Sequence, residues 1–125
     1  MYGGCEASFM SMVVIIEELA RIDPSVSVFM DVQNTLVNTL LLKLGTEEQK
    51  NEWLPKLSKD LVGCFCLSEA SSGSDAFAMK TTAKKDGEHF VINGEKLWIT
   101  NSGHAGLMMV FANANPELVS VLYMW

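Results

Sequence analysis

The spacing of apolar residues changes near residue 60, and this change limits what the chain can fold into. Before Lys59-Asp60 apolar side chains recur at helical spacing, and after it they alternate or form short runs between turn signals. We therefore expect an α+β fold, with a partial helical domain over residues 1–60 and an antiparallel β-domain over residues 61–116. Neither part looks self-sufficient, so the chain is predicted to be a fragment of a larger protein.

Three helices are predicted in the first part. One begins at Phe9, and the second has Asp23-Pro24 as N-cap and first residue and ends at Gly45. The third starts with a capping box over residues 46–49 and should fade near Leu54-Pro55. The second helix is expected to point these residues inward: Val26, Phe29, Met30, Leu36, Val37, Leu40, Leu41 and Leu44.

The second part is predicted to contain strands joined by tight turns at Asp86-Gly87 and Asn93-Gly94. The expected strands are residues 61–69, 79–85, 88–92, 95–100 and 107–112. Cys64 and Cys66 alternate along the first of them, which favours two buried thiols on one face.

Composition excludes several classes of function. The chain has 15 acidic and 9 basic residues, which argues against a nucleic-acid-binding surface. Its longest apolar runs are too short to cross a bilayer, so no membrane insertion is expected. The three cysteines and two histidines form no metal-ligand pattern. The first twenty residues contain no Lys or Arg, and no transit peptide is expected on this chain.

Two short segments suggest a binding site. Residues 65–75 run from an apolar strand into a turn of small residues, which offers hydroxyls and main-chain N–H groups. Trp98 is expected to share one strand face with Lys96 and Thr100. Together the segments would give a flavin dinucleotide an aromatic wall and a phosphate-binding turn. Alternatively, Trp98 covers a neighbouring helix, Ser68 bonds its own backbone, and residues 73–75 are only a turn.

Both segments resemble the flavin-contacting motifs of acyl-CoA dehydrogenases. The likeness extends from Tyr2 to about Pro116 and includes Ile16-Glu17-Glu18-Leu19-Ala20. It implies an N-terminal helical domain, a middle β-domain and a C-terminal helical bundle that this chain lacks. It also implies an FAD cofactor, an acyl-CoA substrate, a homotetramer and electron transfer to electron-transfer flavoprotein.

The resemblance assigns roles to particular residues. It implies no catalytic residue in this chain, because the family's base comes from the C-terminal bundle, and Glu69 is not that base. Ser74 would bind phosphate or the acyl-CoA, Trp98 would lie beside the isoalloxazine, and Thr100 would donate to flavin N5. The full set of cofactor contacts is Phe65, Leu67, Ser68, Gly73, Ser74, Trp98, Ile99 and Thr100.

Residues 65–70 and 77–81 look most like the members specific for short and branched acyl chains. That likeness implies a substrate such as 2-methylbutyryl-CoA, a role in isoleucine and fatty acid breakdown, and the mitochondrial matrix. The alternatives are a non-catalytic truncated isoform, which associates with full-length subunits or is degraded, and a related acyl-CoA oxidase.

The chain departs from the family's pattern at two places. Ser71-Ser72 stand where the family usually has Gly-Ala, and a serine would cost roughly 1 kcal/mol if the backbone at 71 had a positive φ. Residues 117–125 do not continue the family's next strand and are expected to be a tail foreign to the family.

Overall fold

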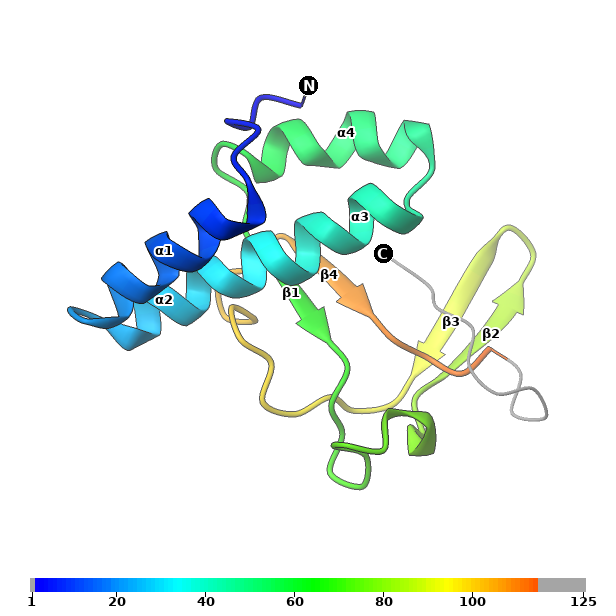
Figure 1. Cartoon of the computed structure of the whole chain (residues 1–125). Coiled ribbons are helices and arrows are strands. Elements are labelled where there is room, and N and C mark those ends of the chain that lie inside the picture. The colour runs from blue at the N-terminus through cyan, green and yellow to red at the C-terminus, as the bar shows by residue number, and fades with distance from the viewer. Residues whose placement is uncertain (1, 115–125) are drawn as a thin grey trace. The chain divides into compact units, whose positions relative to one another are not determined.

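The computed structural model describes residues 2–114, and their contacts divide the chain into two units (Figure 1). The first unit comprises Met1–Cys64 and Thr100–Leu107, and the second comprises Phe65–Ile99 and Met108–Trp125. The chain therefore passes between the units after Cys64, after Ile99 and after Leu107. The predicted tail at 117–125 lies outside the described residues.

The first unit is helical, and its helices start where their caps predict. Asp23 accepts hydrogen bonds from the main-chain N–H groups of Ser25 and Val26, and Thr46 and Gln49 form the predicted capping box. The helical elements are α1 (Phe9–Ala20), α2 (Pro24–Asp31), the π-helix η1 (Val32–Asn38), α3 (Thr39–Leu44) and α4 (Glu47–Leu57).

The run from α2 to α3 is continuous, as Figure 1 shows, but its centre is a π-helix that the sequence did not predict. A π turn shifts each N–H to the carbonyl five residues back, so carbonyls at the changeover lose their usual main-chain donors. Side chains supply donors to them. Asn34 Nδ2 donates to the Met30 carbonyl at 2.9 Å, and Thr35 Oγ1 donates to the Asp31 carbonyl at 2.9 Å.

The π-helix also changes which apolar side chains are buried. Residues before and after it cannot keep one common face, because the helical phase shifts within it. Val37 and Leu41 are buried as predicted. The prediction is wrong for Val26, Leu36 and Leu44, which are 48%, 38% and 61% exposed.

Helix α4 passes through Pro55 and ends at Leu57, so the prediction that it fades near Leu54-Pro55 is wrong. Leu54 and Leu57 are both buried, and the main-chain N–H of Ser58 donates to the Leu54 carbonyl at 3.0 Å. Packing of the last turn therefore stabilises α4 through Leu57, although Pro55 has no main-chain N–H to donate.

Two polar side chains connect segments of the first unit that are distant in sequence. Gln33 Nε2 donates to the carbonyls of Leu57 and Leu61, both at 3.1 Å, and its Oε1 accepts from the Gly63 N–H at 2.8 Å. Asn101 Nδ2 donates to the Phe29 carbonyl at 3.2 Å and the Gly63 carbonyl at 3.3 Å. The segment that follows Thr100 is thereby fixed to the helices.

β2 (Thr82–Asp86) and β3 (His89–Asn93) form an antiparallel hairpin, in register from Thr82 opposite Asn93 to Asp86 opposite His89. β1 (Gly63–Cys66) pairs with β4 (Leu107–Val110), and a 3-10 turn, η2, spans Ala76–Ala78. β1, β2 and β4 are shorter than predicted, and β3 has the predicted length but begins one residue later. Cys64 and Cys66 are both buried, as predicted.

The predicted strand at 95–100 is absent, since that segment is irregular.

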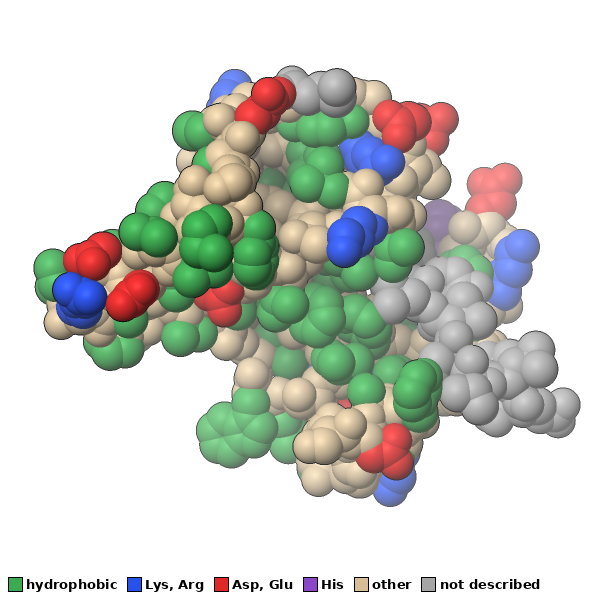
Figure 2. All heavy atoms as spheres, in the orientation of Figure 1, with side chains coloured by type: hydrophobic (Ala, Val, Ile, Leu, Met, Phe, Trp, Pro, Cys, Tyr) green, Lys and Arg blue, Asp and Glu red, His purple; other side chains and the backbone are tan. Residues whose placement is uncertain are grey.

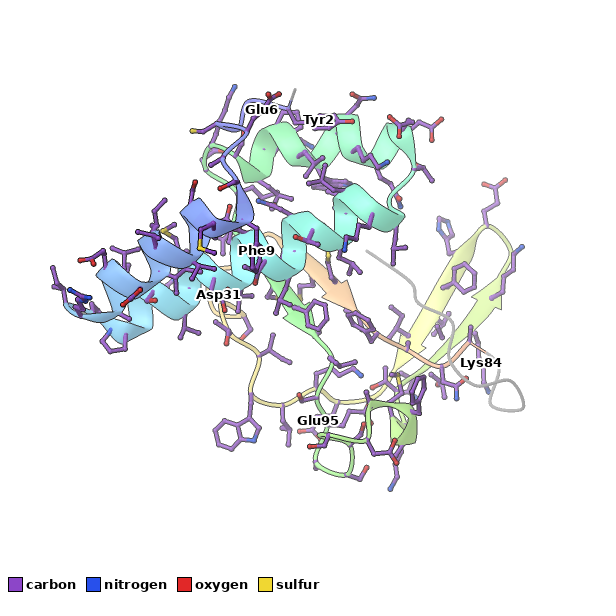
Figure 3. The ribbon with its side chains drawn as sticks, viewed as in Figure 1. Tyr2, Glu6, Phe9, Asp31, Lys84 and Glu95 are labelled. Carbon is purple, nitrogen blue, oxygen red and sulfur yellow. The ribbon has the colours of Figure 1, made fainter. Side chains whose placement is uncertain are left out.

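The first unit exposes many apolar side chains. Helix α1 has no buried residue, and Figure 2 shows hydrophobic side chains gathered over it. Phe9, labelled in Figure 3 at the start of α1, is 74% exposed, and Ile22 is 89% exposed. No helix among the described residues is long and apolar enough to span a bilayer.

Replacing Gln33 tests how much its three hydrogen bonds stabilise the first unit. Gln33→Leu leaves the Gly63 N–H and two carbonyls without this partner, and should lower the free energy of unfolding by about 2–4 kcal/mol. Asn51→Ala is the control, because it removes one exposed hydrogen bond from an amide to a helix carbonyl and should change stability by less than about 0.5 kcal/mol. Urea unfolding measures the free energy of unfolding of both variants. Equal losses would contradict the conclusion that Gln33 stabilises the first unit.

Candidate functional site

The turn that ends the first flavin-like segment closes on itself at Glu69 and Ser72. Their main chains exchange two hydrogen bonds, of 2.9 and 3.1 Å, and Ser72 Oγ donates to the Asp75 carbonyl at 2.8 Å. Positive φ angles at described non-glycine residues occur only at Glu6, Trp98 and Asn101, so Ser71 carries no such strain. The turn accommodates Ser71-Ser72, and the Ser72 hydroxyl adds a bond that alanine could not make.

The carboxylate of Glu69 is the centre of a buried hydrogen-bond network. Its Oε2 accepts from the Lys80 N–H at 2.6 Å, and its Oε1 accepts from the Thr81 N–H at 3.0 Å and from Lys96 Nζ at 2.8 Å. The side chains of Glu69 and Lys96 are only 5% and 10% exposed. Burial raises the pKa of Glu69, but the hydrogen bonds from Lys96 and residues 80–81 outweigh it and lower the pKa to about 2.

Lys96 and Leu97 join the second flavin-like segment to the first. Besides its bond to Glu69, Lys96 Nζ donates to the Leu67 carbonyl at 3.0 Å. The main-chain N–H of Leu97 donates to the Ser68 carbonyl at 2.9 Å. Consecutive carbonyls of the first segment thus bind consecutive residues of the second, and the two segments lie side by side within the second unit.

This pairing explains why residues 95–100 form no strand. The chain turns at Trp98, which has a φ of 58° and is therefore in the left-handed region. Lys96, Trp98 and Thr100 do not share a strand face as predicted. The Trp98 side chain is 94% exposed, so within the described residues it does not cover a helix either.

The predicted flavin contacts divide between the two units. Phe65, Leu67, Ser68, Gly73, Ser74, Trp98 and Ile99 belong to the second unit, and Thr100 belongs to the first. The Phe65 ring packs against Phe111 with ring centres 4.5 Å apart. Ser74 is exposed, and a side chain at Gly73 would meet nothing within 4 Å, so the turn is open to a ligand.

An open pocket of about 340 Å³ adjoins this turn. Its lining residues are Glu69, Ala70, Ser71, Lys80, Thr81, Gly94 and Glu95. Two carboxylates and one ammonium make an unsuitable lining for a pyrophosphate, so we do not place a phosphate there.

The donor groups in the two segments fit a flavin. Among the hydrogen bonds of the described residues, none involves the side-chain hydroxyls of Ser68, Ser74 or Thr100, so these remain available to a ligand. The exposed indole of Trp98 offers an aromatic surface to a ligand.

Sequence reasoning missed the partnership of Glu69 with Lys96. A signal was present, because Glu69 is the only charged residue between positions 61 and 74, in a stretch of apolar and small residues. A lone charge in such a stretch needs a partner if it is buried. Sequence reasoning also missed Asn101, for which we find no comparable signal.

Comparison with known proteins gives consistent matches over most of the chain. The acyl-CoA dehydrogenase N-terminal domain matches residues 1–60, and the acyl-CoA dehydrogenase middle domain matches residues 64–123. The short/branched chain specific acyl-CoA dehydrogenase of Rattus norvegicus is 57% identical over 115 residues, which cover 92% of this chain and 27% of the rat protein. The chain thus spans about a quarter of the length of the curated relatives it matches.

Two solved structures share the fold of this chain. A glutaryl-CoA dehydrogenase from Mycobacterium smegmatis in complex with FADH2 matches with a TM-score of 0.88 and 38% identity, over 92% of this chain and 30% of that one. A structure described as the electron transferring flavoprotein of Acidaminococcus fermentans matches with a TM-score of 0.89 and 35% identity, over 93% and 31%.

Replacing Trp98 tests whether its conformation serves stability. Trp98→Asn should leave the free energy of unfolding unchanged or raise it by up to about 1 kcal/mol, because asparagine tolerates a positive φ and the indole contacts little. Trp53→Asn is the matched control, since that ring is half-buried on α4 with Lys56 Nζ 4.3 Å from its centre. Thermal or urea unfolding should show a loss only for the control. A loss of 2 kcal/mol or more in Trp98→Asn would disprove this interpretation.

The pKa of Glu69 predicts a pH dependence of stability. The folded pKa of about 2 lies below the ordinary value of 4.5. The stabilisation is therefore complete above about pH 4.5 and is lost as the pH falls toward 2, by about 3 kcal/mol in total. Urea unfolding between pH 7 and pH 2.5 should show a shallower dependence in Glu69→Gln than in the wild type. Glu95→Gln, at a neighbouring exposed carboxylate (Figure 3), should keep the wild-type dependence.

Proposed function

Because the chain belongs to the acyl-CoA dehydrogenase family, we propose that it supplies the flavin-facing wall of an FAD-dependent acyl-CoA dehydrogenase. The contacts would come from Phe65, Leu67, Ser68, Gly73, Ser74, Trp98, Ile99 and Thr100. The observation that carries the proposal is the pairing of residues 67–69 with residues 96–97, which brings the first motif beside the residues that precede Trp98. The bound FADH2 of the mycobacterial relative supports the choice of cofactor.

Each group would have a distinct task. The exposed indole of Trp98 would lie against the ring system, and the Thr100 hydroxyl would donate to the N5 edge. The open turn at Gly73-Ser74 would bind the pyrophosphate or the acyl-CoA through a main-chain N–H and a hydroxyl. When bound, FAD would accept the hydride from Cβ of the acyl chain.

The proton from Cα would go to a base outside the described residues, as the family resemblance implies. Glu69 is unsuitable, because a general base needs a pKa near the working pH and must reach the proton that it takes. Its pKa is about 2, and its side chain is only 5% exposed and holds three donors. Glu69 is therefore assigned a structural role, and the complete protein would take its base from another segment.

The proposed substrate and partners are supported by relatives. The rat relative at 57% identity is specific for short and branched chains, which supports an acyl-CoA such as 2-methylbutyryl-CoA. Its description as mitochondrial supports the same compartment, and a place in isoleucine breakdown is what the family resemblance implies. The match to a structure described as an electron transferring flavoprotein supports flavin-based electron transfer, with electron-transfer flavoprotein as the acceptor. The complete enzyme would be a homotetramer, as the family resemblance implies.

A titration of this chain with FAD tests the proposal. Flavin fluorescence should change on binding, and Trp98→Phe should weaken affinity about fivefold, because a smaller ring loses roughly 1 kcal/mol of aromatic contact. Ser74→Ala should weaken it by a similar factor through one lost hydrogen bond. Trp53→Phe, on α4 in the first unit, is the matched control and should bind like the wild type. No binding, or equal effects of the two tryptophan changes, would count against the proposal.

A further inference from the structure

The role of Lys96 goes beyond neutralising a buried carboxylate. Its Nζ lies 2.8 Å from Glu69 Oε1 and 3.0 Å from the Leu67 carbonyl, and its side chain is only 10% exposed. The main-chain carbonyl is a neutral acceptor that does not need a counter-ion. A single ammonium therefore bonds two points of one segment while its own backbone belongs to the other.

The bonds around Lys96 are arranged in sequence. The Leu67 carbonyl accepts a hydrogen bond from the Lys96 side chain. The carbonyl of the next residue, Ser68, accepts from the Leu97 N–H. The side chain of Glu69, which follows Ser68, accepts a second bond from the Lys96 side chain. Beyond Leu97 the chain enters the left-handed conformation of Trp98. The position of Trp98 thus depends on the bonds of the two residues before it.

Glu69 extends this arrangement to a third segment. Its carboxylate also accepts from the main-chain N–H groups of Lys80 and Thr81, which precede β2. In a variant that lacks the Lys96 ammonium, the N–H groups of residues 80 and 81 would still donate to the charged Glu69 carboxylate. The Leu67 carbonyl would lose the hydrogen bond that Lys96 donates to it.

We infer that Lys96 is a positioning residue, which holds the flavin-facing turn and Trp98 in binding geometry through its bonds to Leu67 and Glu69. This inference rests on the proposed function. It predicts that the bridging geometry of the side chain, and not only its charge, is needed for flavin affinity.

The decisive variant is the double substitution Glu69→Gln/Lys96→Met. It leaves no unpaired buried charge, which makes unfolding less of a risk than in Lys96→Met alone. It still removes both bonds that Lys96 donates. Glutamine keeps an acceptor oxygen for only one of the Lys80 and Thr81 N–H groups, so the double variant is compared with Lys96→Met, which keeps both. If the two charges serve only to neutralise each other, the double variant should bind FAD more nearly like the wild type than Lys96→Met does.

Two readouts are measured for the wild type, Lys96→Met, the double variant, Lys96→Arg and Lys84→Met. The first is amide hydrogen exchange at Leu97, which reports the pairing of the segments without any flavin. The second is FAD affinity together with the visible absorption band of the bound flavin. Lys84, labelled on β2 in Figure 3, is an exposed lysine of the same unit and serves as the control.

The expected result is faster exchange at Leu97 and at least about tenfold weaker FAD binding in Lys96→Met and in the double variant, since charge-assisted hydrogen bonds are lost. Lys96→Arg should recover most of the affinity, because a guanidinium can donate to both acceptors. Lys84→Met should match the wild type. Wild-type behaviour of the double variant in both readouts would overturn the inference.

The two proposals can fail separately. If the wild-type chain binds no FAD, the proposed function fails for this chain, and exchange at Leu97 still decides whether Lys96 pairs the segments. If the wild type binds FAD and the double variant binds it equally well, the proposed function stands and the positioning role is disproved.

Discussion

The ion pair between Glu69 and Lys96 is the constraint on which the second unit depends. Burying two charges is costly, and the pair is tolerated only because main-chain groups complete its hydrogen bonding. The pair and its main-chain partners lie in three separate stretches of the chain, which are residues 67–69, residues 80–81 before β2, and Lys96 before Trp98. One charged centre thus determines where the turn closes, where the hairpin begins and where the irregular segment bends.

In the first unit, neutral side chains rather than charged ones make the hydrogen bonds that connect distant segments. At its π-helix, Asn34 and Thr35 donate side-chain hydrogen bonds to the carbonyls of Met30 and Asp31, and Asn101 donates to the Phe29 carbonyl of α2. Gln33 uses both ends of its amide to join the π-helix to the segment before β1. Polar residues that look unremarkable in a helical sequence therefore determine how the helices connect.

Sequence predicted the features that depend on local chemistry. The caps at Asp23 and Thr46, the turn at Asp86-Gly87 and the burial of Cys64 and Cys66 all follow from neighbouring residues, and the family resemblance agrees with the domain matches. The errors arose where distant contacts compete with local pattern. Residues 95–100 alternate like a strand, but bonds to residues 67–69 override that pattern. The π-helix between Asp31 and Thr39 has no sequence periodicity from which it could be predicted. Helix α4 continues past Pro55 because Leu54 and Leu57 are buried.

The discontinuous make-up of the first unit affects any attempt to dissect the protein. Thr100–Leu107 is remote in sequence from the helices yet belongs with them, and Asn101 donates to carbonyls on both α2 and β1. A helical fragment cut after Cys64 would lose these donors and expose the surface that the segment contacts. Modular reuse of the helical part, in a chimaera or a split reporter, therefore requires residues 100–107 to be grafted back through a designed linker.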